Sequence, residues 1–219
     1  MQHQITIRSI TIREQRRSNR SYIGSLNAEK LLFDTSWALA QANVPETWTQ
    51  FDTKGGGESV AIPDLLIASD HPGLEILDEN SSRNVTIARF NESGDIVAHT
   101  LDPYLEYPIT WGGHAPGVSG VAVGGNSSGV HIGVAPEADL IYAQLEGVFS
   151  PNSSTFADIM GWMVDNNATA VSLSVGISDE ESLTPAMAAI DNATDNGTDR
   201  ACCVGQQWSE CHRCSNQFL

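Results

Sequence analysis

The chain has 219 residues, of which 41% are hydrophobic, and this is enough for one ordinary domain with its own core. It carries 27 acidic residues against 11 lysines and arginines, a net charge of −16, which disfavours nucleic acid or an anionic membrane surface as its main partner. No segment reaches the roughly 18 consecutive apolar residues that a membrane-spanning helix needs.

The first forty residues include a basic run. The segment REQRRSNR at 13–20 is basic, but no apolar stretch follows it as it would in a secretion signal. We expect residues 1–40 to form a mobile, solvated arm. Nine Asn-x-Ser/Thr sequons are consistent with export, although a chain rich in these residues also acquires sequons by chance.

Strand and helix patterns alternate from residue 58 onward. The apolar runs ESVAIPD at 58–64 and ADLIYAQL at 138–145 predict two buried strands, and TAVSLSVG at 169–176 predicts a third. Alternation of this kind is typical of right-handed β-α-β units. The predicted fold class is therefore α/β with three layers, in which helices cover both faces of a mostly parallel sheet.

Two helices are predicted after the second strand. The first lies within 150–168, begins with a Ser or Thr N-cap, and buries Phe156, Ile159, Met160, Met163 and Val164 at helical spacing. Its methionines and Trp162 are expected to be core residues rather than a cofactor site. The second helix lies within 182–197, with Pro185 in its first turn and Gly197 at its end.

Asp64 and His114 are the first candidates for chemistry. Asp64 ends the first predicted strand, and His114 begins a predicted helix of small residues in GGHAPGVSGVAVGG at 112–125. Functional residues of α/β sheets gather at the carboxyl ends of strands, where a carboxylate could orient an imidazole that accepts a proton from serine or cysteine. The other histidines considered, His71, His99 and His131, are expected to be surface or loop residues.

Four segments occur in the order and spacing of a known set of motifs. GGGESVAIPDLLIASDHPGLEIL at 55–77 matches an acid motif, and HAPGVSGVAVGG at 114–125 matches H-G-T-H-V-A-G-T. GVHIGVAPEADLIYAQL at 129–145 matches G-V-A-P-x-A-x-L, and GWMVDNNATAVSLSVG at 161–176 matches a helix and strand ending in S-x-S-L-G. The chain thus resembles the subtilisin-like serine proteases, the subtilases of peptidase family S8, and is most similar to their acidic haloarchaeal type.

The resemblance implies a secreted endopeptidase that cleaves peptide or protein substrates through an Asp/His/Ser triad. In it, Asp64 is the catalytic acid and His114 the general base, while Ser174, Val175 and Gly176 bind the substrate backbone. The catalytic domain would begin at 41 and extend to 198. ANVPETW at 42–48 resembles the start of a mature subtilase, which implies that residues 1–40 are a leader or propeptide remnant. The family implies no organic cofactor; calcium is possible, but no metal site is assigned, and no oligomeric state is predicted.

The chain departs from the family pattern beside both candidate residues. Asp64 is followed by Leu65 and Leu66 where the family has Ser or Thr and then Gly, which predicts backbone strain if a positive φ is required there. His114 is followed by Ala-Pro-Gly instead of Gly-Thr-His, and Pro116 removes a backbone N–H near the start of the helix. Both changes are expected to alter the geometry around the pair.

The family's oxyanion asparagine and its nucleophile motif G-T-S-M-A-x-P do not occur in the 219 residues, so we expect truncation before the catalytic serine and no activity of the chain alone. Residues 199–219 are instead an aberrant tail that holds all four cysteines, Cys202, Cys203, Cys211 and Cys214. The tail can be back-translated so that a one-nucleotide shift restores a Gly-Asn segment, which suggests a frameshift near Thr198. Zinc binding or disulfides are the alternatives for the cysteines.

Three functions stay open on the sequence. The first is a subtilisin-like endopeptidase represented by its first part. The second is a non-enzymatic fragment or a remnant that still binds peptides, and the third is a C-terminal zinc-binding module.

Overall fold

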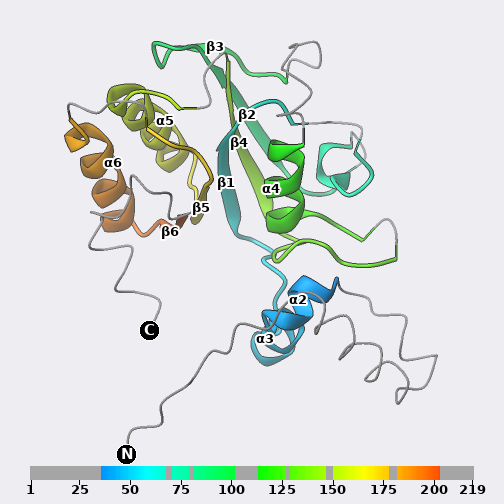
Figure 1. Ribbon diagram of the computed structural model, residues 1–219. Coiled ribbons are helices and arrows are strands. Elements are labelled where there is room, and N and C mark those ends of the chain that lie inside the picture. The colour runs from blue at the N-terminus through cyan, green and yellow to red at the C-terminus, as the bar shows by residue number, and fades with distance from the viewer. Residues whose placement is uncertain are drawn as a thin grey trace, which may run out of the picture. The chain divides into compact units, whose positions relative to one another are not determined.

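The computed structural model describes residues 36–67, 71–78, 81–101, 113–126, 129–146, 150–177 and 182–202. The strands found there are β1 (Ser59–Asp64), β2 (Val85–Phe90), β3 (Ile96–Ala98), β4 (Asp139–Leu145), β5 (Ala170–Leu173) and β6 (Asp199–Cys202). They form a six-stranded sheet in the order β3-β2-β4-β1-β5-β6 (Figure 1). Every neighbouring pair is parallel except β2 and β3, which confirms the predicted mostly parallel sheet.

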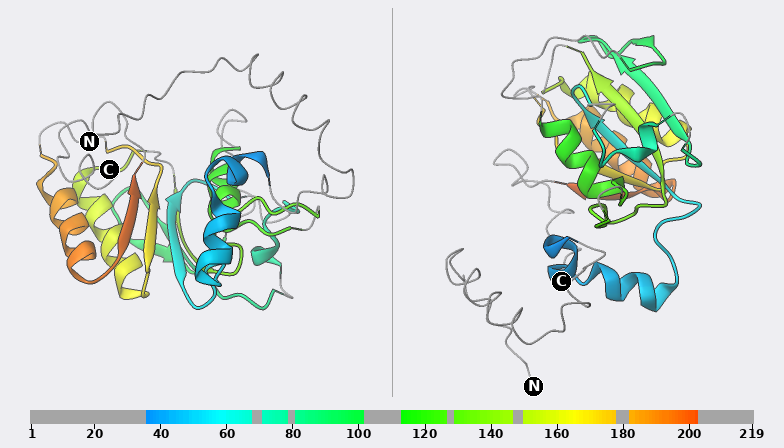
Figure 2. Two further views of the ribbon diagram at one scale, coloured as in Figure 1. Left: turned by 90° about the horizontal axis from the view of Figure 1, so that it is seen from below. Right: turned by 90° about the vertical axis from the view of Figure 1, so that its right-hand side faces the viewer.

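Helices cover both faces of this sheet. The described helices are α2 (Trp37–Gln41), α3 (Val44–Phe51), α4 (His114–Val123), α5 (Ser153–Asp165) and α6 (Thr184–Asp195), with a short 3-10 helix at Glu75–Leu77. Figure 2 shows α4 on one side of the strands and the adjacent helices α5 and α6 on the other. The three-layer α/β architecture is therefore confirmed.

The residues of β1 point alternately into two separate cores. Ala61 packs with the apolar residues of α5 and α6, whereas Ile62 packs with those of α4. Asp64 shares the parity of Ile62, so its side chain faces α4. Because β4 pairs with β1 in parallel, with Tyr142 opposite Ile62 and Gln144 opposite Asp64, these two β4 side chains share the same face.

Four of the five residues predicted on the apolar face of α5, Phe156, Ile159, Met160 and Met163, are almost completely buried. The fifth, Val164, is only partly buried, and it packs against the same core. The N-cap of α5 is Asn152, whose side chain accepts a hydrogen bond from the Thr155 N–H, and not the predicted Ser or Thr. Asn is as good a cap as Ser, so the pattern was compatible with either.

The other predicted features of these helices also occur. Trp162 is partly buried and packs edge to face on Phe90 with ring centroids 5.5 Å apart. Pro185 lies in the first turn of α6, and Gly197 follows the helix with a φ of 85°. A positive φ just beyond a helix is the conformation that glycine adopts without strain.

Two parts of the fold were not predicted. The β2–β3 hairpin turns through Asn91 and Gly94, although VTIARF in β2 has a strand-like composition. The short helices α2 and α3 precede the sheet, and α2 crosses the predicted boundary at residue 40. Trp48 of α3 donates a hydrogen bond from Nε1 to the Val134 carbonyl, which ties this helical segment to the loop before β4.

Other sequence predictions lie partly outside the described residues. Residues 1–35 and 203–219, which include Cys203, Cys211 and Cys214, are outside, so the predicted leader and the cysteine chemistry stay predictions. The backbone of β6 pairs in parallel with β5, which places residues 199–202 of the predicted tail in the sheet. Within the described residues, no helix is both long and apolar enough to cross a bilayer.

The packing of α5 on the sheet yields a stability prediction. Met163 is fully buried, so Met163→Ala leaves a cavity and is expected to lower the free energy of unfolding by about 2–5 kcal/mol. Val121 on α4 is 61% exposed, and Val121→Ala is expected to change it by less than about 0.5 kcal/mol. Urea unfolding of both variants makes the comparison, and equal losses would contradict the assigned packing.

Candidate active site

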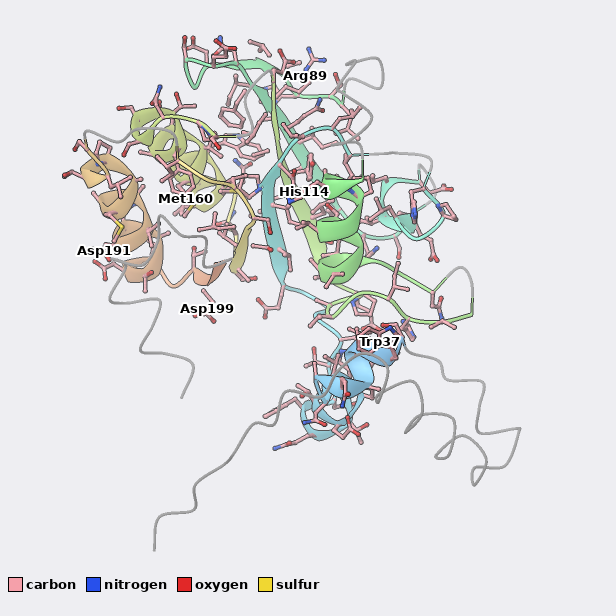
Figure 3. All side chains as sticks on the ribbon, in the orientation of Figure 1. Trp37, Arg89, His114, Met160, Asp191 and Asp199 are labelled. Atoms are coloured by element: carbon pink, nitrogen blue, oxygen red, sulfur yellow. The ribbon has the colours of Figure 1, made fainter. Side chains whose placement is uncertain are left out.

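Asp64 and His114, the two residues predicted to cooperate, are in direct contact. The Nδ1 atom of His114 lies 2.9 Å from Oδ2 and 3.0 Å from Oδ1 of Asp64. The Asp64 side chain is fully buried, whereas the His114 side chain is 35% exposed. One end of the imidazole therefore meets a buried carboxylate while the ring still reaches the surface, next to the strands in Figure 3.

The sheet topology explains why the contact forms at this point. In the sheet, β1 has β4 on one side and β5 on the other. From β1 the chain continues to β2 on the far side of β4, whereas from β4 it continues to β5 on the far side of β1, so the two neighbouring strands connect in opposite directions. Asp64 is the last residue of β1 and therefore lies at the carboxyl edge of the topological switch point. Crevices at such points are where open α/β sheets bind their ligands.

The start of α4 places the imidazole. His114 is the first residue of the helix, after Gly113, and the Gly117 N–H donates to the Gly113 carbonyl. Pro116 lies in the first turn, where backbone N–H groups have no partner within the helix, so its missing donor costs no helical hydrogen bond. Ala115 is buried in the core that includes Ile62 and Tyr142 of the sheet, where a small residue permits close packing.

The expected strain beside Asp64 does not occur. Among the described residues, the only non-glycine positions with positive φ are Asn43, Asp52 and Asn167, so Leu65 and Leu66 both have ordinary backbone conformations. That prediction was wrong because the chain leaves β1 by a path that needs no glycine. Leu65 instead packs its side chain into the core shared with α5 and α6.

Burial sets the electrostatics of the pair. It raises the pKa of the Asp64 carboxyl above its ordinary value of 3.8, because the charged form loses its hydration. Hydrogen bonds act in the opposite direction: the Leu65 N–H donates to Oδ1 at 2.7 Å, and His114 also stabilises the carboxylate. The loss of hydration is the largest of these effects.

The geometry defines what the pair can do chemically. An ionised carboxylate only accepts hydrogen bonds, so the proton of a neutral His114 ring is on Nδ1 when it bonds to Asp64. The Nε2 atom is then the basic nitrogen, and the carboxylate stabilises the imidazolium after proton uptake. This is the arrangement of a general base with its orienting acid.

The third predicted element, Ser174 to Gly176, follows β5 directly. The strand ends at Leu173, earlier than the sequence predicted, and Ser174, Val175 and Gly176 have no regular secondary structure. Val175 is buried while its two neighbours are half-buried, so the alternation of β5 continues beyond its last pairing.

Two groups that hold the turn after Asp64 were not predicted from the sequence. The Leu65 N–H is one, and the second is Tyr142 of β4, whose hydroxyl donates to the Leu65 carbonyl at 2.5 Å. The alternation in ADLIYAQL could have assigned Tyr142 to one face of the sheet, but the identity of that face depends on the register with β1.

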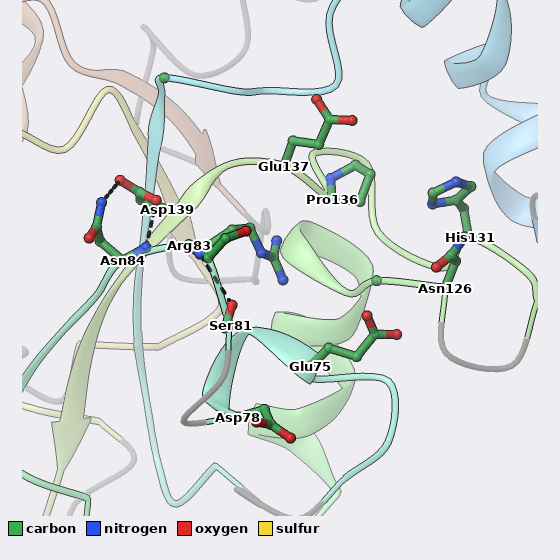
Figure 4. Close-up of a pocket in the computed structure, with 13 residues that line it drawn as sticks. Glu75, Asp78, Ser81, Arg83, Asn84, Asn126, His131, Pro136, Glu137 and Asp139 are labelled. Atoms are coloured by element: carbon green, nitrogen blue, oxygen red, sulfur yellow. Dashed lines mark hydrogen bonds between the residues drawn. The ribbon is translucent and has the colours of Figure 1, made fainter.

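A charged pocket lies away from the pair, at the amino ends of the strands (Figure 4). Its volume is about 860 Å³, and its charged lining residues are Glu75, Asp78, Arg83, Glu137 and Asp139. Arg83 donates from Nη1 to the carbonyl of Val123, the last residue of α4, as a cation at a helix C-terminus should. Among the described side chains, no group of three or more His, Cys, Asp or Glu has the arrangement of a metal site.

The raised pKa of Asp64 determines the sign of a pH effect. A carboxyl whose pKa is higher in the folded protein contributes stability below its unfolded value of 3.8 and loses that contribution as pH rises through the folded value. Asp64→Asn removes this titration. Thermal unfolding should be measured from pH values below 3.8 upward. As pH rises, the thermal midpoint of wild type should fall relative to that of Asp64→Asn. The opposite trend would mean that the ion pair outweighs the loss of hydration.

With the geometry in place, similarity to known proteins assigns the family. A subtilase family model, peptidase S8, matches residues 55–209, which is more than half of the chain, while no curated protein matches it. Similar solved structures include the prenylagaramide maturation protease PagA, with a TM-score of 0.51 and 17% identity over 73% of this chain and 49% of that one. The nisin leader peptidase NisP from Lactococcus lactis gives 0.51 and 17% over 70% and 45%.

The macrocyclase domain of PatG is a third similar structure, with a TM-score of 0.51 and 16% identity over 70% of this chain and 57% of that one. At these identities the likeness shows a shared fold, and the chain spans about half the length of these structures. The match of the family model over residues 55–209 carries the assignment: the chain belongs to the subtilase family.

Proposed function

We propose that the chain carries the acid and the base of a subtilisin-like serine endopeptidase. The observation that carries this proposal is the hydrogen bond from His114 to the buried carboxylate of Asp64 at the topological switch point. Membership of the subtilase family makes peptides and proteins the substrate class. As in many subtilases, we infer that the protein acts after export.

In this mechanism His114 is the general base. Its Nε2 accepts the hydroxyl proton of a serine as the serine oxygen attacks the scissile carbonyl, and it later donates that proton to the leaving amine. Asp64 holds the Nδ1 proton, which fixes the tautomer and the ring orientation, and it stabilises the imidazolium in the transition state. Once the leaving amine has taken the proton, both residues are again in the protonation states in which they began.

Ser174, Val175 and Gly176 are the proposed binding strand for the substrate backbone. The alternation of burial continues through these residues after β5 has ended, and an extended peptide can pair with backbone of that kind. A Cβ added to Gly176 would come within 3.2 Å of Ser150 Oγ, so a side chain at this position would crowd the neighbouring loop. Glycine keeps this backbone approachable.

The 219-residue chain is expected to be inactive by itself. Its sequence lacks G-T-S-M-A-x-P, and general-base catalysis by this triad requires the serine that the motif carries. Purified chain mixed with a chromogenic peptide should show the same background rate as His114→Ala. Turnover that a serine-directed phosphonate inhibits would contradict this expectation.

The frameshift proposal adds a positive test of the same site. We expect the gene's nucleotide sequence after Thr198 to encode the Gly-Asn turn and G-T-S-M-A-x-P in another frame, and a protein expressed in that frame should cleave the peptide. There His114→Ala should lower kcat by about 10⁶-fold and Asp64→Asn by about 10⁴-fold, the losses seen in comparable triads. His99→Ala, an exposed histidine on the β3 side, is the matched control and should keep full activity.

A restored protein that is active and insensitive to His114→Ala would refute the assigned base. If no other frame encodes the two motifs, the frameshift proposal is wrong, while the roles of Asp64 and His114 still stand on their geometry and on the family.

A further inference from the structure

Both backbone polar groups of Leu65 are occupied at the turn where the chain leaves β1. The N–H donates to Oδ1 of Asp64 at 2.7 Å, and the carbonyl accepts a hydrogen bond from the hydroxyl of Tyr142. The peptide groups on either side of Leu65 are thus fixed at both ends, one by the acid itself and the other by the neighbouring strand. Oδ1 of Asp64 is therefore held by the N–H of Leu65, and the carbonyl of the same residue is held by Tyr142.

Tyr142 reaches this carbonyl because of its register. It lies opposite Ile62 on the face of β4 that also carries Gln144, and its ring packs in the core shared with α4. The residue is completely buried, so its hydroxyl and the Leu65 carbonyl have both left water. A buried hydroxyl of this kind is strongly disfavoured unless it is hydrogen-bonded, which makes the contact persistent.

The turn also lacks local means of fixing itself. Leu65 and Leu66 have no side-chain hydroxyl and no glycine conformation, and their φ values are negative. A side-chain hydroxyl at the position after the acid would have offered a local hydrogen bond to the backbone. In this chain a hydroxyl of the adjacent strand, that of Tyr142, donates to the Leu65 carbonyl.

We propose that Tyr142 is a positioning residue for the catalytic acid, a role that rests on the proposed function of Asp64 and His114. Its hydroxyl fixes the Leu65 peptide, the Leu65 N–H fixes Oδ1, and the oriented carboxylate holds the Nδ1 proton of His114. Tyr142 does not touch the substrate or the reacting atoms. It acts on the tautomer and the orientation of the base through three successive hydrogen bonds: Tyr142 to Leu65, Leu65 to Asp64, and His114 to Asp64.

Proton NMR of the full 219-residue chain tests this chain of contacts directly. The readouts are the downfield resonance of the His114 Nδ1 proton, assigned by its loss in Asp64→Asn, and the hydrogen exchange of the Leu65 amide. Tyr142→Phe keeps the ring and removes the hydroxyl. It should move the His114 resonance upfield or broaden it, and it should speed exchange of the Leu65 amide about tenfold.

The matched control removes a buried hydroxyl elsewhere. Thr198 is 4% exposed, and its Oγ1 donates to the Ala168 carbonyl, so Thr198→Val also deletes one buried hydroxyl-to-carbonyl hydrogen bond. It should lower the thermal midpoint as Tyr142→Phe does, yet leave the His114 resonance and the Leu65 exchange rate unchanged. A change in both variants would indicate general loosening and would refute a specific role for Tyr142.

The remaining outcomes separate this proposal from the proposed function. A His114 resonance that is present in wild type and identical in Tyr142→Phe overturns the positioning role alone. A wild-type chain with no resonance that depends on Asp64 overturns the acid–base pair, and the positioning role with it. If Tyr142→Phe does not fold, Tyr142→Met, which fills the same region without a hydroxyl, is subject to the same expectations.

Discussion

The hydrogen bond between Asp64 and His114 joins residues that are 50 positions apart in the chain. It forms because two independent features agree. The alternation of β1 directs its last side chain toward α4, and α4 begins with the imidazole at the end of the helix nearest to that side chain. A shift of β1 by one residue would direct Asp64 into the apolar core against α5 and α6, where no partner of this kind is found among the described residues.

Burial of the Asp64 carboxylate is the largest free-energy cost of this site. Removing a carboxylate from water costs several kcal/mol even after the protein relaxes, while each hydrogen bond to a charged group returns about 1.5–3 kcal/mol. Asp64 accepts such bonds from the Leu65 N–H and from His114, and its pKa is nevertheless raised. The two donors therefore offset only part of the lost hydration. Loss of either donor would move the acid toward its protonated form, which cannot stabilise an imidazolium.

The sequence was most informative where one periodicity controls a whole element. The buried face of α5, the start of α4 at His114 and the end of β1 at Asp64 all followed from spacing or from motif order. Predictions about single backbone angles were weaker. Leucine after the acid suggested strain, yet Leu65 relies on a path that the residues of β4 and the core determine, and no local pattern encodes that path.

Contacts between strands could not be predicted from the sequence either. Tyr142 is one of the seven residues of β4. Only the parallel register with β1 shows that its hydroxyl lies near the turn after Asp64. Ser174 to Gly176 illustrate the same limit, because the composition of 169–176 is that of a strand throughout while β5 ends at Leu173. A strand ends where its pairing ends, and pairing is a property of two segments.

The local architecture also shows how Asp64 and His114 come into contact although the residues beside them differ from the family pattern. Around Asp64 the structure fixes the acid through an N–H in the following peptide and a hydroxyl on the adjacent strand, and neither requires Ser-Gly after the acid. Around His114 the proline occupies a turn position that needs no donor. In both cases the altered side chains belong to main-chain neighbours of the pair, whereas the acid is held by the backbone N–H of Leu65, the Leu65 carbonyl by Tyr142 of β4, and the base by the start of α4. The geometry of Asp64 and His114 therefore depends more on the register of β1 and β4 and on the start of α4 than on the identity of the residues that follow each of them in the sequence.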